Sequence, residues 1–229
     1  MTLPFEGCVS LAWRGSLACA LPCTSLSFAS CYVYSPRGAG VAAEASRRVC
    51  ARVKAIDPLW LARYAGSVYH ASLRDPQLAA LFAGGAVLVP VPGSSISGDA
   101  PWAASQLATA LRELGLAHRL WVGLRRRIAV RKSSTAPCGE RPTVSEHYES
   151  FFVAPALTSL SRLVLIDDVV TKGRTLFAAA ARLQAELPHA DIRAFALIRT
   201  QGFLQQLGSV FESCHGVIRW AGGDARREP

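Results

Sequence analysis

Two adjacent carboxylates, Asp167 and Asp168, follow an apolar run and stand a few residues before a glycine. The segment reads LVLIDDVVTKGRTL from residue 163 to residue 176. Neighbouring carboxylates repel each other, and burying them without partners is costly, so their position asks for a chemical reason. Ionised carboxylates accept hydrogen bonds, and two of them side by side can accept from two hydroxyl groups. The pair is therefore a candidate receptor for the vicinal hydroxyls of a sugar.

The turn that follows the two acids has the composition of an anion site. A glycine there lets the backbone approach a ligand closely, and the free amides and dipole of the helix that begins after it favour a phosphate. The order of residues fits neither a Walker A loop nor a G-x-G-x-x-G motif. A phosphate site beside a diol receptor indicates a phosphorylated sugar. The candidate phosphate-binding residues are Thr171, Lys172, Gly173, Arg174 and Thr175.

The elements that must position these residues alternate between strand and helix from about residue 86 onward. This alternation predicts an α/β fold with a mostly parallel twisted sheet flanked by helices. Residues 1–80 fit the alternation poorly and are predicted to form a small N-terminal hood or peripheral segment beside an α/β domain over 81–229. The expected strands cover 86–91, 119–124, 163–166 and 191–199, with another candidate at 215–220 and a frayed tail; the expected helices cover 42–55, 75–85, 101–116 and 175–187.

A second strand end carries small residues, in the segment AVLVPVPGSS from residue 86 to residue 95. Ligands of parallel sheets bind at the carboxyl ends of the strands, so this turn belongs beside the acidic one. The polar segment 125–150 has the length and charge of a lid that closes over a substrate, with a solvated surface loop as the alternative. The residues of the small turn are Val91, Pro92, Gly93 and Ser94.

The segment VLIDDVVTKGRT resembles the phosphoribosyl pyrophosphate (PRPP) motif of the type I phosphoribosyltransferase superfamily. That motif has an apolar strand, two acids, two apolar residues, a short Thr- and Gly-containing turn, and a helix. Within the superfamily the chain is most similar to the competence protein F (amidophosphoribosyltransferase-like) group, which shares the VPVP strand end. The resemblance covers roughly residues 85–200. It departs from the family at Lys172, where Thr or Ser is common, and in lacking the group's N-terminal zinc-ribbon cysteines.

The resemblance implies an enzyme that uses PRPP with Mg²⁺, transfers the phosphoribosyl group to a nitrogen acceptor and releases pyrophosphate. It implies that Asp167 and Asp168 hold the ribose hydroxyls, that 171–175 form the 5′-phosphate cup, and that 91–94 form the pyrophosphate loop. No residue is assigned directly to the metal ion. Members of the superfamily are often dimers, so a homodimer is also an expectation. The acceptor base or amine has no motif.

Three residues of the polar segment are the expected phosphate contacts of the lid. The resemblance implies that Arg131 and Lys132 act directly on the pyrophosphate during catalysis, and that Arg141 assists them when the lid closes. Excluding water at that moment would protect the reaction from hydrolysis. His147 follows the lid and is more often structural in such a position than an acid or base.

Composition leaves two other functions open. The formal charge is +9, from 25 Lys and Arg against 16 Asp and Glu, so a competence-type association with DNA is an alternative, although no nucleic-acid motif is present. A non-catalytic sensor of PRPP or a nucleotide is the other alternative, since the chain departs from the family at Lys172 and after VPVP, where ISGDAPWAAS replaces the expected arginine-glycine-asparagine segment. A test for pyrophosphate release separates the enzyme from the sensor.

The cysteines and the apolar opening bear on the compartment. Seven cysteines in a chain of 229 residues contain no C-x2-C pair, which argues against zinc and favours reduced thiols. Arg14 and Pro22 interrupt the apolar opening before it reaches the length of a membrane span, and the start lacks the basic region of a signal peptide. We therefore expect a cytoplasmic protein without membrane contact, with secretion as the alternative.

Overall fold

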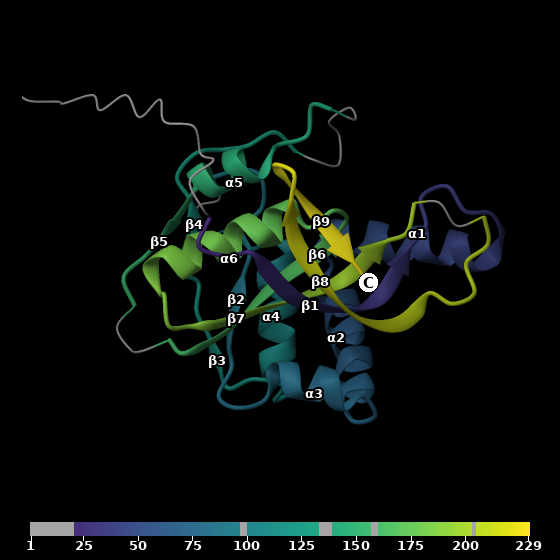
Figure 1. The fold of residues 1–229 in the computed structure, drawn as a ribbon. Helices are drawn as coiled ribbons and strands as arrows, with labels where there is room; N and C mark the ends of the chain where they lie inside the picture. The colour runs from purple at the N-terminus through teal and green to yellow at the C-terminus, as the bar shows by residue number, and fades with distance from the viewer. Residues whose placement is uncertain (1–20, 97–99, 133–138, 157–159, 203–204) are drawn as a thin grey trace, which may run out of the picture.

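The computed structural model describes residues 21–96, 100–132, 139–156, 160–202 and 205–229. This part of the chain has a mixed α/β architecture, with a central sheet of seven strands in the order β3-β2-β6-β7-β1-β8-β9 and a separate two-stranded ribbon of β4 and β5 (Figure 1). The strands are β1 (Ser25–Tyr34), β2 (Val87–Pro90), β3 (Arg119–Leu120), β4 (Leu124–Arg126), β5 (Phe151–Val153), β6 (Arg162–Val170), β7 (Asp191–Thr200), β8 (Phe211–Ala221) and β9 (Asp224–Glu228).

Six helices within the described residues cover the two faces of the sheet (Figure 1). Helices α5 and α6 contribute to one apolar core, and helices α1 to α4 contribute to the other. None of the described helices is both long and apolar enough to span a membrane. The helices are α1 (Gly40–Lys54), α2 (Pro58–Ser72), α3 (Pro76–Phe82), α4 (Ala103–Glu113), α5 (Val144–Ser150) and α6 (Arg174–Glu186).

The sheet is mostly parallel, as the alternation of strands and helices predicts. Strands β3, β2, β6, β7 and β1 run parallel to one another, whereas β8 pairs antiparallel with β1 and β9 pairs antiparallel with β8. The apolar runs of β2 and β6 are buried on both faces, which is characteristic of strands covered by helices on each side. Both strands end at the same edge of the sheet, and this edge carries the candidate site.

The structure differs from the expected N-terminal hood in the placement of β1. This strand is not peripheral: it lies inside the sheet, with Phe28 paired to Ala194 of β7 on one side and to Gly216 of β8 on the other. Its segment, SLSFASCYVY, is apolar almost throughout, and most of it is buried. An apolar run far from any alternating pattern can be placed only by its tertiary partners. The alternative of an N-terminal signal falls partly on residues 1–20, which lie outside the described residues.

Two further expectations are wrong in detail. The tail is not frayed, because Gly222 and Gly223 take positive φ angles and form the turn that folds β9 back onto β8. The polar segment 125–150 is not a single loop, because its last residues form α5. Thr143 caps this helix, accepting from the Glu146 amide at 3.2 Å while the Glu146 carboxylate accepts from the Thr143 amide at 2.6 Å.

Candidate functional site

The two acids lie within β6, which extends past them to Val170. Before the acids, Leu165 packs in the core beneath α6 and Ile166 in the opposite core; after them, Val169 packs with the opposite core and Val170 beneath α6. Strict alternation would put residues 165 and 169 on the same face. The alternation of the apolar side chains therefore changes phase across the two acids.

Lys54, at the end of α1, forms an ion pair with the second acid. Its ammonium lies 2.6 Å from Oδ2 of Asp168. Burial acts to lower the pKa of Lys54, but the Asp168 carboxylate outweighs it and the pKa is raised. Asp168 Oδ1 accepts from the Val169 amide at 2.8 Å. A carboxylate offers about four acceptor sites, so Asp168 keeps sites for a ligand hydroxyl.

Asp167 carries an unfavourable charge. Burial raises the pKa of its carboxyl, and the neighbouring Asp168 charge raises it further, against the lowering effect of Lys54. One of its oxygens accepts from the Asp168 amide at 2.9 Å. A positive charge developing on a nearby ligand would favour the ionised form. The site therefore holds a carboxyl group that responds strongly to the charge of what binds beside it.

Replacing Asp167 by asparagine is expected to remove a pH dependence of stability. Because the folded-state pKa is above the unfolded value near 3.9, the folded protein binds the extra proton, and the free energy of unfolding falls as the pH rises from about 4 through the folded pKa. Each unit of pKa difference corresponds to about 1.4 kcal/mol. Urea unfolding at a series of pH values measures this slope. An unchanged slope in Asp167→Asn would show that another group causes it.

The turn after β6 is held tightly against the sheet. Gly173 takes φ +88° and is the N-cap of α6, and a Cβ atom built on it would lie 2.6 Å from Cδ1 of Ile218 in β8. The hydroxyl oxygens of Thr171 and Thr200 lie 3.1 Å apart. Only glycine combines this φ angle with this approach. The turn is thus fixed in position, and the amides of the first turn of α6 have no partner within the helix.

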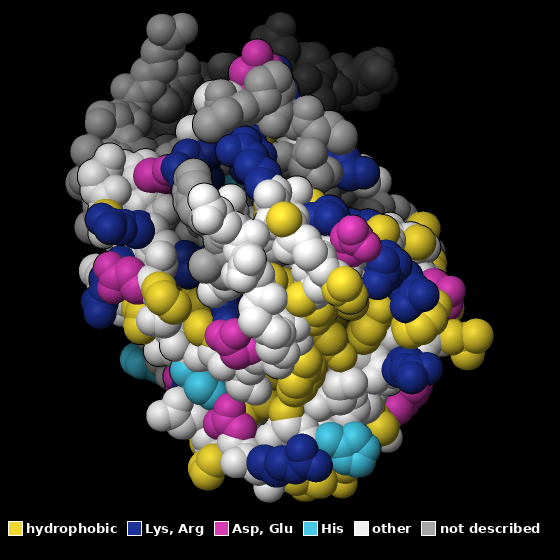
Figure 2. All heavy atoms as spheres, turned by 90° about the vertical axis from the view of Figure 1, so that its right-hand side faces the viewer, with side chains coloured by type: hydrophobic (Ala, Val, Ile, Leu, Met, Phe, Trp, Pro, Cys, Tyr) yellow, Lys and Arg dark blue, Asp and Glu magenta, His cyan; other side chains and the backbone are white. Residues whose placement is uncertain are grey.

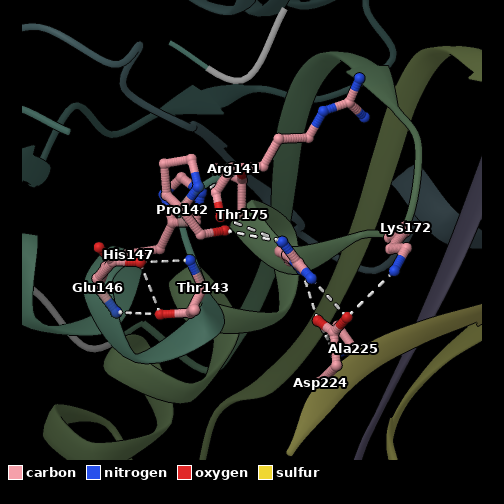
Figure 3. A network of polar contacts seen from close by, with 10 residues as sticks. Arg141, Pro142, Thr143, Glu146, His147, Lys172, Thr175, Asp224 and Ala225 are labelled. Atoms are coloured by element: carbon pink, nitrogen blue, oxygen red, sulfur yellow. Dashed lines mark hydrogen bonds and ion pairs between the residues drawn. The ribbon is translucent and has the colours of Figure 1, made fainter. Parts of the chain in front are cut away.

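The two cationic side chains of the turn gather on Asp224, beside the turn between β8 and β9 (Figure 3). Arg174 donates through Nε and Nη2 to the two carboxylate oxygens, at 2.5 and 2.6 Å, and Lys172 Nζ lies 3.3 Å from Oδ2. These bonds from Arg174 lower the pKa of Asp224. A ligand anion in the turn would therefore meet amides and hydroxyls more directly than the Arg174 guanidinium.

A hollow of about 440 Å³ opens between this turn and the β8–β9 hairpin. Its lining has more basic than acidic residues, with Lys172, Arg226 and Arg227 against Asp224. An anionic group in this hollow would add the negative charge that the lining lacks. Its lining residues are Thr171, Lys172, Ala221, Asp224, Ala225, Arg226 and Arg227.

The small turn over 91–94 lies next to the acidic strand, because β2 pairs with β6 from Val87–Leu163 to Pro90–Ile166. The Val91 amide continues the pairing with a bond of 2.9 Å to the Ile166 carbonyl. The indole of Trp102 donates to the Val91 carbonyl at 2.8 Å. The structure therefore places the expected pyrophosphate turn, Val91 to Ser94, beside the expected ribose and phosphate residues.

The polar segment is attached at both ends to these two turns. At its start the Val130 amide donates to the Ser94 carbonyl at 2.8 Å. At its end the Arg174 guanidinium donates to the carbonyls of Arg141 and Pro142, each at 3.3 Å (Figure 3). A change in the position of this segment would therefore alter hydrogen bonds at both turns.

The expected lid cations are exposed. Arg131 forms an ion pair with Glu140 of the same segment, and Lys132 lies beside it at the surface. The Arg141 side chain extends away from the network around Arg174 (Figure 3). The structure thus brings the two turns and the two acids to one edge of the sheet and leaves these three cations at its periphery.

Three side chains that the residue patterns did not single out, or singled out only weakly, belong to this edge. Lys54 comes from the segment over 1–80 that was expected to be peripheral, and no motif there indicates a contact with Asp168. Arg126 stands within a run of three arginines, yet only 6 % of its surface is exposed. His147 is also buried and contacts Arg126, with 3.1 Å between Nη2 and Nδ1. The alternation of β4, with Leu124 and Arg126 buried and Arg125 exposed, is the one local signal that distinguishes the buried arginine from its neighbours.

Metal ligands and redox groups are few here. Within the described residues, no group of three or more His, Cys, Asp or Glu side chains is arranged to hold a metal ion. The described cysteines, Cys23, Cys31, Cys50 and Cys214, are free thiols. Comparison with known proteins adds no relative, because no protein-family model and no curated protein sequence matches the chain.

Proposed function

We propose that this protein is a phosphoribosyltransferase of the type I superfamily that binds PRPP and transfers its phosphoribosyl group to a nitrogen acceptor, releasing pyrophosphate. The observation that carries the proposal is the adjacency of two strand ends. The turn over 91–94 and the acids Asp167 and Asp168 come from paired strands, and the turn over 171–175 follows directly. A diol receptor with an anion site on each side matches a ribose that carries a phosphate at each end.

The acids would act on the ribose. Their free acceptor sites would take the two ring hydroxyls and so orient the sugar. As the bond between C1 and the pyrophosphate oxygen breaks, positive charge develops on the ribose ring. A carboxylate that is unfavourable in the empty site becomes favourable beside this charge, so Asp167 would stabilise the transition state more than the ground state.

The two turns would hold the anions. Backbone amides at the start of α6 and the Thr175 hydroxyl would bind the 5′-phosphate, while the 91–94 turn would face the leaving pyrophosphate. Arg131, Lys132 and Arg141 would reach the pyrophosphate only if the polar segment moved towards the site. Its attachment to both turns makes it a suitable lid.

Mg²⁺ fits this site as a partner of the ligand. Asp167 and Asp168 provide hard oxygen donors but too few for a complete shell, so an ion would take most of its ligands from the diphosphate and water. When bound, it would neutralise charge on the leaving group. The residues of the chain would orient the ribose and exclude water around it.

A non-catalytic PRPP sensor is the second candidate, and the Lys54–Asp168 ion pair favours it. An ammonium 2.6 Å from Asp168 offsets negative charge that the transferase would direct at the ribose. DNA binding has no such support. On the face shown in Figure 2, basic side chains lie in separate groups with acidic and apolar side chains between them, rather than in one continuous basic surface.

The wild-type protein, mixed with PRPP, Mg²⁺ and pooled nucleobases, is expected to release pyrophosphate in a time-dependent reaction. A coupled phosphate assay measures the release, and omission of the nucleobases shows whether an acceptor is needed. Calorimetric titration with PRPP and Mg²⁺ measures binding separately. Binding without release would support the sensor. If the protein neither binds PRPP nor releases pyrophosphate, both the transferase and the sensor are excluded.

A further inference from the structure

A buried chain of polar contacts joins the two turns beneath the proposed site. Arg126, in the ribbon strand β4, donates through Nε to the Gly93 carbonyl and through Nη2 to Nδ1 of His147, the latter at 3.1 Å. Nε2 of His147 lies 3.3 Å from the Thr175 hydroxyl oxygen. Contacts therefore run without a gap from the 91–94 turn to the 171–175 turn. We call Gly93, Arg126, His147 and Thr175 the buried polar chain.

The surroundings hold the middle of this chain in one arrangement. The Arg126 side chain also donates to the Ser150 hydroxyl, which in turn donates to the His147 carbonyl at 2.6 Å. The guanidinium lies 4.2 Å above the ring of Phe151, and the His147 ring is stacked on the same residue with 6.4 Å between centroids. Arg126, His147, Ser150 and Phe151 are all buried. Packing and hydrogen bonds together leave the histidine ring little freedom.

The chemistry of arginine fixes where the histidine proton lies. An arginine side chain only donates, so Nδ1 of His147 must accept from Arg126 and cannot carry a proton. A neutral imidazole then has its proton on Nε2, which donates to Thr175. Burial and then the Arg126 charge lower the pKa of His147 to about 4, which agrees with a neutral ring.

The same logic fixes the Thr175 hydroxyl. Its oxygen accepts from His147, so its single hydrogen is not used in that bond and can be donated to another group. Thr175 lies in the first turn of α6, where backbone amides also lack helical partners. An anion in this turn would accept from the hydroxyl and the amides together.

At the other end, Arg126 orients the small turn. The Gly93 carbonyl points to the buried guanidinium, and a trans peptide is planar, so the Ser94 amide of the same unit points the opposite way. Arg126 thus sets the direction of an amide in the expected pyrophosphate turn.

We propose that Arg126 and His147 are positioning residues that hold a hydroxyl donor of one anion turn and an amide donor of the other in register. The inference rests on the proposed function for the identity of the anions. The positioning role itself requires only that the 171–175 turn binds a phosphate group, whichever molecule carries it. Neither residue touches the substrate; both act through the groups they orient.

The test measures inorganic phosphate affinity of the full chain by calorimetry or phosphorus NMR, in wild type, His147→Phe, Thr175→Val and the double variant. Each single change is expected to weaken binding about tenfold, the size of one hydrogen bond to an ionised group. Because both remove the same oriented donor, the double variant should bind no more weakly than Thr175→Val alone. Additive losses, or no phosphate binding by wild type, would overturn the proposal.

Two further measurements separate positioning from structure. His147→Gln keeps a side-chain donor and should retain phosphate affinity within about threefold, whereas a loss equal to that of His147→Phe would contradict the assignment. His215→Phe is the matched control, because His215 lies outside the buried polar chain and pairs with Asp75 at 2.7 Å. This variant should leave the phosphate affinity unchanged. Unfolding curves show which variants remain folded.

Long-range nitrogen–proton NMR of the wild type reports the ring directly. A neutral His147 protonated on Nε2 at neutral pH is expected; a proton on Nδ1 would overturn the proposal. These readouts use neither PRPP nor turnover, so they also separate the two claims. If the losses of His147→Phe and Thr175→Val are not additive but the protein does not turn over PRPP, the role of the buried polar chain is supported and the transferase is refuted. If the losses are additive but the protein turns over PRPP, the role of the buried polar chain is refuted and the transferase is supported.

Discussion

Replacing Asp168 by asparagine is expected to abolish most phosphoribosyl transfer while the protein stays folded. The amide has nearly the same shape but carries no charge to oppose the positive charge that develops on the ribose. Loss of one such electrostatic contact costs on the order of 2–4 kcal/mol in the transition state, which is roughly 30- to 1000-fold in rate. Pyrophosphate release under saturating PRPP measures this loss.

The stability of this variant should change little. The substitution breaks the ion pair with Lys54, but the Lys54 side chain is 45 % exposed and that of Asp168 is 15 % exposed. Solvent screens a pair of this kind, so we expect about 1 kcal/mol or less. Asp191→Asn is a matched control, because Asp191 pairs with Arg193 at the start of β7, away from the site. Full PRPP turnover in Asp168→Asn would refute the proposed role.

Replacing Gly173 by alanine is expected to cause a large loss of stability. At φ +88° an L-residue is strained by about 1–2 kcal/mol. The new Cβ would also lie 2.6 Å from Cδ1 and 2.8 Å from Cγ1 of Ile218, and overpacking of this kind costs a further 1–3 kcal/mol or so. The free energy of unfolding should therefore fall by about 2–5 kcal/mol, as measured by urea denaturation.

Gly223 supplies the control that separates the two costs. Its φ is +87°, almost identical to that of Gly173, but a Cβ built on it meets no atom within 4 Å. Gly223→Ala should therefore show the backbone strain alone, about 1–2 kcal/mol. Equal losses in the two variants would mean that the contact with Ile218 relaxes at no cost and that the turn is not held against β8.

The elements that could be predicted from the sequence are those whose local apolar pattern already indicates how they are buried in the fold. The apolar run before Asp167 forms a strand that is buried on both faces, and the apolar, alanine-rich segment 174–186 forms a helix that packs on it. Their order along the chain is enough to place the acids and the phosphate turn at one edge of a parallel sheet. The mostly parallel sheet is confirmed; the binding of PRPP stays a prediction.

The contacts that escaped prediction depend on partners distant in the sequence. Lys54 meets Asp168 only because α1 packs against the sheet, and Asp224 meets Arg174 only because the tail folds back as β9. Arg126 lies between two exposed arginines, and its burial follows from its place in the ribbon with β5, on the same face as the buried Leu124. Each of these charges acquires its role from tertiary packing rather than from a motif.

The position of β1 inside the sheet has a consequence for the newly made chain. This strand leaves the ribosome long before its neighbours, which lie near residues 194–200 and 211–219, so both of its edges stay unpaired while the segment between them is synthesised. Pairing between such distant segments is slow, and open strand edges attract other chains. The nascent protein is therefore most vulnerable to aggregation, and most in need of chaperones, in the interval before β7 and β8 emerge.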